Sequence, residues 1–385
     1  MIAPVVVVGT GAAGLTVAEA LRREGYDGRL VLIGEENHLP YDRPPLSKGV
    51  LLGAVETSRL ALRAPAVIEA LDADLLLGRR AKGLDIGQRI VTLEDGTALG
   101  YGTLVIATGV RARRLPAASP GATVHTVRTI EDTLALAEDL VDADSVVVIG
   151  GGLLGYELAA TTRMLGLEVT LLDRSVRPLV RMLGPDVGAM LATIHAERGV
   201  GVRTAAAVSR IASHPHGIQV VDRGTPMHAS VVIAAVGSVT NTEWLRGSRL
   251  RVDDGVVCDR NGRAAADVYA VGDVARWADD DGDGERIEHR TSASEQAMAV
   301  ARSIMQGDER PRPPRYFWTD QFDIKVQVAG AVDGSSTFMI AEGEIAAGRF
   351  VALTRSSGGR GVIGWRMPRE FAKHRAALAS EQWGA

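Results

Sequence analysis

The apolar positions of the chain gather in short aliphatic runs, and two of these runs begin the same pattern. Val5–Val8 and Ser145–Ile149 each lead into a glycine-rich turn, which is followed by a stretch rich in small residues. A short aliphatic run bounded by glycine is typical of a strand buried on both faces. The small-residue stretches are predicted to be helices that end near Glu24 and Leu165. The pattern therefore predicts two strand–turn–helix units.

Both turns have the spacing of a dinucleotide-binding motif. Their glycines are Gly9, Gly11 and Gly14 in the first unit and Gly150, Gly152 and Gly155 in the second. The first glycine of such a turn permits a tight bend, the second lets the backbone approach a pyrophosphate, and the third lets helix and strand pack closely. The phosphates then lie at the helix N-terminus, where free N–H groups and the helix dipole favour an anion.

A second strand and an acid follow each helix. Leu30–Ile33 is followed by Glu35, and Val169–Leu172 is followed by Asp173. Each carboxylate is placed to accept hydrogen bonds from the hydroxyls of a ribose. One glycine-rich turn alone is weak evidence, but here strand, turn, helix, second strand and acid all occur twice. The sequence therefore predicts a duplicated βαβ fold with two dinucleotide sites.

Further segments fall around these two units. Residues 104–109 and 231–237 are each predicted to be a buried strand that ends at a glycine and closes one unit. Residues 267–275 are predicted to be a strand that runs into the start of a helix. Residues 279–285 have the composition of a solvated acidic loop, and the prolines of residues 310–314 predict a linker.

Composition limits the classes of function. The 385 residues are too many for one hydrophobic core, and 46% of them are hydrophobic. The net charge of -4 gives no basic field for a nucleic acid, and no apolar run is long enough to cross a membrane, so a cytoplasmic location is expected. The single Cys258 excludes an intrachain disulfide, a Cys-x-x-Cys pair and a cysteine-rich metal site, and no metal is predicted. Its strand-like surroundings favour a small buried side chain.

Several longer motifs resemble those of the FAD-dependent ferredoxin reductases of bacterial oxygenase systems. The more specific ones are the run Leu39-Pro40-Tyr41-Asp42-Arg43-Pro44-Pro45-Leu46-Ser47-Lys48 and the run Phe317-Trp318-Thr319-Asp320-Gln321. Less specific matches include Ala107-Thr108-Gly109, residues 128–132, residues 269–275 and residues 366–371. The resemblance covers nearly the whole chain.

The resemblance implies a fold class and an order of domains. We expect an α/β protein with two Rossmann-like nucleotide-binding domains, as in glutathione reductase, and a small α+β C-terminal domain with a last helix from about Pro368. FAD would be bound by residues 1–112 and 238–312, NAD(P)H by residues 113–237, and the C-terminal domain would span residues 313–385.

The resemblance also implies the cofactor-binding residues. The FAD contacts would come from the first glycine turn and from Ala13, Glu35, Arg43, Lys48, Ala81, Ala107, Thr108, Gly109, Arg128, Gly272 and Asp273. The nicotinamide nucleotide would lie over the second glycine turn, with Leu154, Asp173 and Gly237. Surface salt bridges for Arg43 and Lys48, and a helix cap for Asp273, are the structural alternatives.

Two positions depart from the family pattern. Ala81 stands where a valine is usual, and Arg290 stands where relatives often carry a hydrophobic residue or tryptophan. Arg290 is predicted to lie where the chain passes the flavin. Its guanidinium would favour the reduced, anionic flavin if it reached the ring, and would have no effect if it pointed to solvent; the sequence leaves both open.

The resemblance places two catalytic residues. Glu157, just after the second turn, would lie by the nicotinamide, and Trp318 would flank the flavin where an acceptor docks. An exposed helix acid and a core indole are the respective alternatives. With no cysteine pair to relay electrons, the flavin would pass them directly to a one-electron carrier or to oxygen.

The expected partner is a ferredoxin, with two irons and two sulfurs, that serves a downstream oxygenase. Residues 311–385 hold ten Lys and Arg against seven Asp and Glu, a modest bias that suits an acidic partner. The alternatives are rubredoxin, another carrier or oxygen as acceptor, or a redox-sensing flavoprotein like the apoptosis-inducing-factor group. NADH is expected over NADPH because Asp173 would repel a 2′-phosphate, although Arg174 and Arg177 follow it.

Overall fold

The chain folds into two compact units, each assembled from three segments. The computed structural model describes residues 3–278, 282, 284–307 and 314–378. Unit 1 comprises Met1–Asp42, Leu60–Arg111 and Val239–Pro313, and unit 2 comprises Arg43–Arg59, Ala112–Ser238 and Pro314–Ala385. Strands β8 (Val110–Ala112) and β16 (Ser238–Thr240) pair where the chain passes between the units.

Unit 1 is built on a six-stranded sheet of order β18-β19-β7-β1-β2-β3. The strands pair in parallel except for β18 and β19, which are antiparallel. Their bounds are β1 (Val5–Val8), β2 (Leu30–Ile33), β3 (Ala73–Leu76), β7 (Thr103–Ile106), β18 (Arg263–Ala265) and β19 (Val268–Ala270). All four residues of β1 are buried, because the strand lies inside the sheet and both of its faces are covered.

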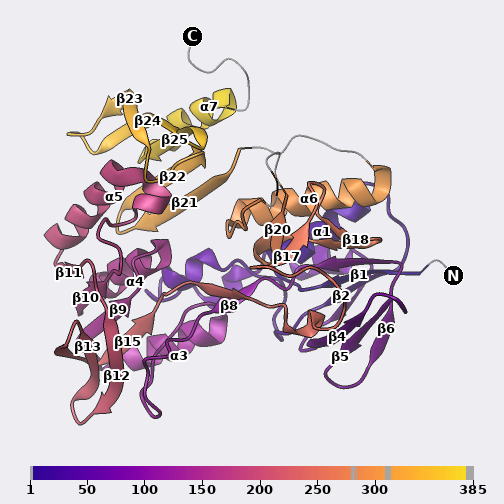
Figure 1. Cartoon of the computed structure of the whole chain (residues 1–385), viewed down its shortest axis with the longest axis horizontal. Helices are drawn as coiled ribbons and strands as arrows, with labels where there is room; N and C mark the ends of the chain where they lie inside the picture. Colours follow the sequence, from indigo (N-terminus) through magenta and orange to yellow (C-terminus); the bar gives the residue numbers. More distant parts are fainter. Residues whose placement is uncertain (1–2, 279–281, 283, 308–313, 379–385) are drawn as a thin grey trace. The chain divides into compact units, whose positions relative to one another are not determined.

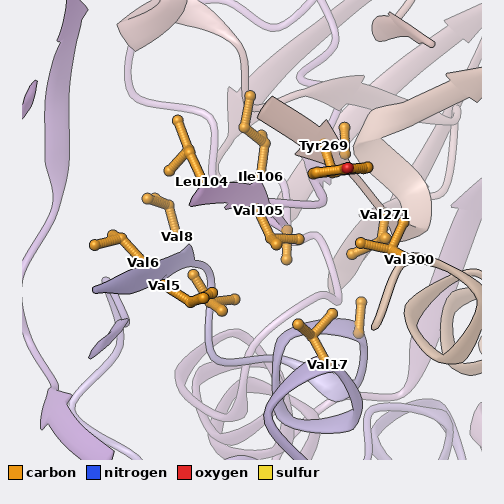
Figure 2. Close-up of a cluster of buried hydrophobic side chains, with 14 of the residues drawn as sticks. Val5, Val6, Val8, Val17, Leu104, Val105, Ile106, Tyr269, Val271 and Val300 are labelled. Atoms are coloured by element: carbon orange, nitrogen blue, oxygen red, sulfur yellow. The ribbon is translucent and has the colours of Figure 1, made fainter. Parts of the chain in front are cut away.

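Helices α1 (Ala12–Arg23) and α6 (Arg290–Gln306) pack against each other in unit 1 (Figure 1). Val17 of α1 and Val300 of α6 are fully buried and belong to the same apolar cluster as Val105 of β7 (Figure 2).

The remaining elements of unit 1 are shorter than these two helices. They are α2 (Pro65–Glu69), the antiparallel sheet of β4 (Ala81–Asp85), β5 (Ile90–Leu93) and β6 (Ala98–Gly100), the parallel pair β17 (Val256–Cys258) and β20 (Ala275–Trp277), and 3-10 helices at Thr57–Leu60, Glu243–Leu245 and Gly272–Val274. Of these, residues 57–59 belong to unit 2.

Unit 2 repeats the strand–turn–helix pattern on a smaller parallel sheet of order β11-β10-β9-β15. Its strands are β9 (Ser145–Ile149), β10 (Glu168–Leu172), β11 (Val200–Arg203) and β15 (Val231–Ala234), and its helices are α3 (Ile130–Leu140), α4 (Leu153–Met164) and α5 (Val180–Glu197), which is kinked at Gly184. An antiparallel sheet of β12 (Val208–His214), β13 (Gly217–Asp222) and β14 (Thr225–Ala229) follows.

The C-terminal part of unit 2 is a five-stranded antiparallel sheet of order β21-β22-β25-β24-β23, with one helix packed on β25. The elements are β21 (Tyr316–Gln321), β22 (Ile324–Gly330), β23 (Thr337–Glu344), β24 (Arg349–Ser356), β25 (Gly359–Trp365) and α7 (Pro368–Leu378). Strand β21 contacts α4, and so does the 3-10 helix Pro44–Ser47 of the first segment of unit 2.

The predicted fold class is confirmed, and one local prediction is wrong. The segment 267–275 does not enter a helix: β19 ends in a single 3-10 turn, Gly272–Val274, and the chain continues as strand β20. Gly272 has a left-handed φ of 75°, and its N–H is satisfied by the side chain of Gln296 rather than by a helical carbonyl. The acidic loop predicted at 279–285 and the linker predicted at 310–314 fall largely outside the described residues.

Among the described residues, no helix combines the length and the apolar character that a membrane span requires.

Candidate functional site

The first glycine turn of unit 1 leaves an open cradle at the start of α1. A Cβ at Gly14 would lie 1.8 Å from the carbonyl oxygen of Gly9, so helix and turn pack with no room for a side chain. A Cβ at Gly9 would lie 2.1 Å from the carbonyl oxygen of Ala107, at the end of β7. By contrast, no atom of the described residues beyond the adjacent backbone lies within 4 Å of a Cβ at Gly11, where a ligand would approach.

The second turn, in unit 2, has the same geometry. A Cβ would lie 2.1 Å from the carbonyl oxygen of Ala235 at Gly150, and 1.8 Å from that of Gly150 at Gly155. At Gly152, a Cβ would have no atom of the described chain within 4 Å apart from the adjacent backbone. The N-caps of α1 and α4 make no side-chain hydrogen bond. Free helical N–H groups beside open backbone suit a pyrophosphate, so the residues present fit two dinucleotides.

Asp173 is the strongest ribose-binding candidate in the second cradle. Its side chain is buried at 2% exposure, and Oδ1 accepts a hydrogen bond of 2.8 Å from the N–H of Ser175. Oδ2 is buried and has no hydrogen-bond partner among the described residues. A Cβ at Gly151 would lie 1.8 Å from Cγ of Asp173, so the carboxylate packs directly on the turn. A buried acceptor left without a donor fits a ribose hydroxyl.

The acid of the first unit is placed differently. Glu35 is exposed and forms an ion pair of 3.3 Å with Arg80. The position of unit 1 that matches Asp173 in strand register is Gly34, because Ile33 pairs with Val8 as Leu172 pairs with Ile149. A Cβ at Gly34 would lie 2.3 Å from Oγ1 of Thr10. The sequence pattern treats Glu35 and Asp173 as equivalent, but Glu35 lies one residue further from its strand than Asp173 does.

The other residues predicted to bind FAD are divided between the units. In unit 1, the Ala107-Thr108-Gly109 loop is tied to Asn241 by hydrogen bonds of 2.8 and 2.9 Å that involve Thr108. Ala81 lies half-buried at the start of β4. A Cβ at Gly272 would lie 3.1 Å from that of Ala13, so the turn before Asp273 packs on the start of α1.

Arg290 is bound by two side chains of unit 1. Its Nε donates to Asp42 Oδ1 at 2.8 Å and its Nη1 donates to Ser294 Oγ at 2.8 Å, all within unit 1. The side chain is 28% exposed. The guanidinium is therefore held by protein acceptors on the Pro40–Asp42 segment and on α6.

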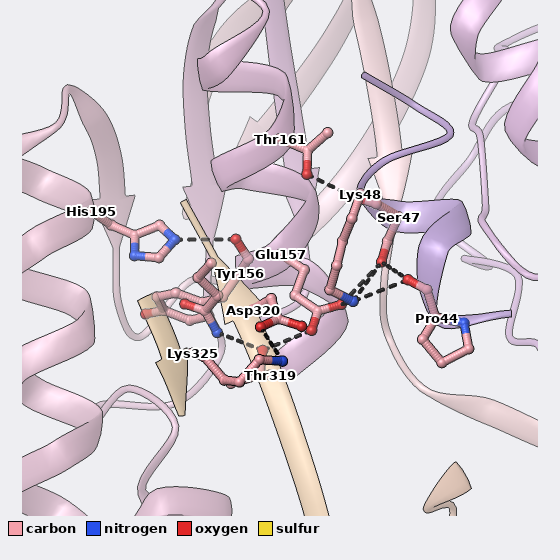
Figure 3. Close-up of polar contacts among 11 residues, drawn as sticks. Pro44, Ser47, Lys48, Tyr156, Glu157, Thr161, His195, Thr319, Asp320 and Lys325 are labelled. Atoms are coloured by element: carbon pink, nitrogen blue, oxygen red, sulfur yellow. Dashed lines mark hydrogen bonds and ion pairs between the residues drawn. The ribbon is translucent and has the colours of Figure 1, made fainter. Parts of the chain in front are cut away.

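In unit 2, Glu157 lies at the centre of a buried polar cluster (Figure 3). Its Oε2 accepts from Lys48 Nζ at 2.6 Å and from Ser47 Oγ at 3.0 Å, and its Oε1 accepts from Thr319 Oγ1 at 2.7 Å. Glu157 is 8% exposed, which excludes the alternative of an exposed helix acid. Lys48 likewise pairs inside the protein and not on its surface.

Neighbouring contacts hold the cluster in place. Lys48 Nζ also donates to the carbonyl oxygen of Pro44 at 3.1 Å, and Thr161 Oγ1 donates to that of Ser47 at 2.8 Å. Arg43 Nη1 donates to the carbonyl oxygen of Arg128 at 2.5 Å. The run Pro44–Ser47 thus folds as a 3-10 helix that presents Ser47 and Lys48 to α4.

Trp318 projects from the opposite face of β21. Successive side chains of a strand alternate between faces, so Trp318 and Thr319 point apart. Trp318 is half-buried and stacks near Tyr316, with ring centroids 6.0 Å apart. It is not a core indole.

Sequence reasoning missed Ser47 and Thr319 as partners of Glu157. Both lie in the motifs that carried the resemblance, next to Lys48 and Trp318. The available signal was the alternation of β21, which places Thr319 on the face opposite Trp318. Small hydroxyl side chains gave no reason of their own to be singled out.

Two glycine turns of this geometry, each at the end of a parallel strand and the start of a helix, indicate an oxidoreductase that binds two dinucleotides. The comparisons agree. The model of the family described as pyridine nucleotide-disulphide oxidoreductase matches residues 3–297, and the model described as reductase C-terminal matches residues 316–383. The chain belongs to the pyridine nucleotide-disulphide oxidoreductase family.

Relatives narrow the class further. The chain is 37% identical over 375 residues to the ferredoxin–NAD(+) reductase subunit of a benzene 1,2-dioxygenase system from Pseudomonas putida, covering 96% of this chain and 90% of that protein. It is 35% identical to putidaredoxin reductase from Pseudomonas putida, over 87% of this chain and 82% of that protein. A crystal structure of a covalent putidaredoxin reductase–putidaredoxin complex matches with a TM-score of 0.91 and 33% identity, covering 98% of this chain and 93% of that one. The predicted oxidoreductase class and the cofactors FAD and NADH are confirmed.

Proposed function

We propose that this chain takes hydride from NADH and passes the electrons through FAD to a small iron–sulfur ferredoxin that serves an oxygenase. The observation that carries the proposal is the presence of two open dinucleotide cradles in a sequence with one cysteine. That residue, Cys258, is 3% exposed and lies in β17, outside both turns. With no thiol relay, electrons leave the flavin directly for the acceptor.

The relatives supply the kind of acceptor. The benzene dioxygenase subunit is named a ferredoxin–NAD(+) reductase, and the solved structure is a complex with putidaredoxin. The similarity extends through the C-terminal domain, where the model described as reductase C-terminal matches residues 316–383. We therefore favour a ferredoxin over rubredoxin, oxygen or a redox-sensing function.

Each part of the chain has a defined task in this proposal. Bound FAD accepts two electrons as hydride and releases them one at a time. The turn around Gly11 holds the pyrophosphate of FAD, and the turn around Gly152 holds that of NADH. Asp173 Oδ2 accepts from the adenosine ribose of NADH. Glu157 and Lys48 form a buried ion pair that keeps the two charges together where the nicotinamide is expected to lie.

The binding of an acidic ferredoxin is expected to depend on salt. Residues 311–385 have a net charge of +3 in a chain whose net charge is -4, so their attraction to an acidic ferredoxin is modest. Salt screens this attraction once the Debye length falls to a few ångströms. The assignment of the docking surface to these residues is a proposal. The cytoplasmic location stays a prediction of the sequence.

The test is NADH-dependent reduction of cytochrome c with and without an added ferredoxin. Putidaredoxin and a rubredoxin serve as matched acceptors, and oxygen consumption is followed in their absence. We expect turnover to require a ferredoxin and to fall as salt is raised. Equal rates without any carrier would favour oxygen as acceptor, and rapid turnover with rubredoxin alone would favour that carrier. Slow turnover with every acceptor, together with a conformational response to NADH, would favour a redox-sensing protein.

A further inference from the structure

The two oxygens of the Glu157 carboxylate are held unequally. Within the part of the chain that the structure describes, Oε2 accepts two hydrogen bonds, from Ser47 and Lys48, and Oε1 accepts one, from Thr319 at 2.7 Å (Figure 3). Ser47 and Lys48 come from the 3-10 helix and its end, and Thr319 comes from β21. The carboxylate is therefore fixed from two sides by separate segments of unit 2.

The hydroxyl of Thr319 has a defined direction. Thr319 is fully buried, and its Oγ1 accepts a hydrogen bond of 3.1 Å from Nε2 of Gln321. Since an amide N–H can only donate, the hydrogen of the hydroxyl is left for Glu157 Oε1. Gln321 is itself 1% exposed, so water does not compete for this contact. The three side chains form a relay that runs from Gln321 through Thr319 to Glu157.

The alternation of β21 separates this relay from the residues on the other face of the strand. Thr319 and Gln321 share one face, which contacts α4. Asp320 lies on the opposite face and pairs with Lys325 at 2.6 Å, and Trp318 lies on that face as well. Changes at Thr319 and Gln321 therefore act on Glu157 without removing a contact of Trp318.

We propose that Thr319, oriented by Gln321, is a positioning residue for the hydride-transfer step. It holds the Glu157 carboxylate in the rotamer that pairs with Lys48, so that the C-terminal domain sets the geometry of the ion pair. The inference rests on the proposed function in one respect, the placement of Glu157 and Lys48 beside the nicotinamide and the flavin. A carboxylate that loses a buried donor either turns away or recruits another, and both outcomes loosen its bond to Lys48.

The test compares Thr319→Val with Thr319→Ser. Valine has nearly the same shape but no hydroxyl, and serine restores the hydroxyl without the methyl group. Single-turnover reduction of the bound flavin by NADH, measured without acceptor, is expected to slow about tenfold in Thr319→Val, which corresponds to roughly 1.4 kcal/mol. Thr319→Ser is expected to stay within about threefold of the wild type, a difference of roughly 0.6 kcal/mol.

Two measurements that do not depend on turnover accompany the rates. The dissociation constant for NAD(+), measured by calorimetry, is expected to change less than twofold, because Asp173 and the second turn are untouched. The flavin reduction potential is expected to rise in Thr319→Val and to return in Thr319→Ser, since a Lys48 with a loosened partner favours the reduced, anionic flavin. A purely structural defect would lower the thermal midpoint without this pattern of rescue.

Gln321→Leu provides an independent test of the proposal if Thr319→Val fails to fold. It leaves the hydroxyl in place but frees it to rotate, so a smaller loss of rate in the same direction is expected. Wild-type rates in both variants, or a Thr319→Ser as slow as Thr319→Val, would overturn the proposal. Because no acceptor is present, the failure of ferredoxin as partner would not affect these results, and a wild type that NADH cannot reduce would instead reject the proposed function.

Discussion

The two glycine turns have the same backbone geometry but differ in the side chains that pack beside them. Gly9 and Gly150 have left-handed φ values of 115° and 127°, and both turns leave the middle glycine open. In unit 2, however, the position after the first glycine is Gly151 and the strand ends at Asp173. In unit 1 the corresponding pair is Thr10 and Gly34. The larger side chain therefore lies at the strand end in unit 2 and in the turn in unit 1.

This exchange shows which part of the motif is general. The backbone of the turn is the same in both units and leaves a space that suits a phosphate. The position of the acid depends on the space beside the turn. Gly151 leaves room for a buried carboxylate, whereas Thr10 occupies the matching space in unit 1, and Glu35 lies one residue further along and is exposed. Two copies of one motif therefore place their acids at different positions relative to the turn.

The largest expected effect comes from closing one cradle at a time. Gly11→Val is expected to abolish flavin retention because its side chain occupies the space that the pyrophosphate needs. The matched variant Gly152→Val is expected to keep its flavin but lose NADH binding. Flavin absorbance per chain and calorimetric titration with NAD(+) distinguish the two. Full flavin occupancy in Gly11→Val would show that the first site is misplaced.

A second variant transfers the side-chain arrangement of unit 1 into unit 2. Gly151→Thr alone is expected to destabilise unit 2 and to raise KM for NADH by about ten- to a hundredfold, since Asp173 must move. Adding Asp173→Gly is expected to recover the thermal midpoint but not the affinity. If the double variant binds NADH like the wild type, the buried carboxylate has no part in recognition.

The choice of nicotinamide depends on the same carboxylate. Asp173 is buried and Arg174 is exposed, so the two side chains leave the strand in different directions. The ratio of kcat/KM for NADH over NADPH is expected to exceed about ten, since repulsion of the 2′-phosphate costs roughly 1.4 kcal/mol or more. Asp173→Ala should shrink that ratio by improving the use of NADPH. A wild-type ratio below one would mean that Arg174 and Arg177 dominate.

The smallest effect is expected outside both turns. Cys258→Ser should leave ferredoxin-dependent turnover nearly unchanged, because the buried thiol of β17 takes no part in electron transfer. A modest fall in the thermal midpoint is expected from placing a hydroxyl among apolar neighbours. A tenfold loss of turnover with FAD still bound would reveal a cysteine relay.

The fold could be predicted largely because its signals are local. Aliphatic runs such as Val5–Val8 and the glycine spacing that follows them fix strand, turn and helix within about 20 residues. The 3-10 turn at Gly272 was missed since it depends on Gln296, a residue of another helix. Register explains why Glu35 and Asp173 lie at different positions: counting residues from the glycines does not show which position lies beside the turn.

The candidate site was predictable only in part. Glu157 and Lys48 carried charge and stood in motifs, so each could be named, but their pairing joins segments far apart in sequence. Thr319 and Gln321 bring no charge and no distinctive spacing. Arg290 could be flagged as a departure from the family, yet its partner Asp42 belongs to another segment. The sequence could not predict these contacts because they join residues that are far apart along the chain and meet only in the folded protein.

The order of strands in unit 1 has a consequence for synthesis on the ribosome. β7 lies between β1 and β19, and β19 is made only after the whole of residues 107–267. Strands β1, β2, β3 and β7 are synthesised before β19. At ordinary rates of translation, β7 therefore keeps an unpaired apolar edge for on the order of ten seconds. The parallel sheet of unit 2 is complete by Ala234. We therefore expect the second nucleotide fold to become protease-resistant first on stalled nascent chains, and the edge of β7 to be a binding site for chaperones.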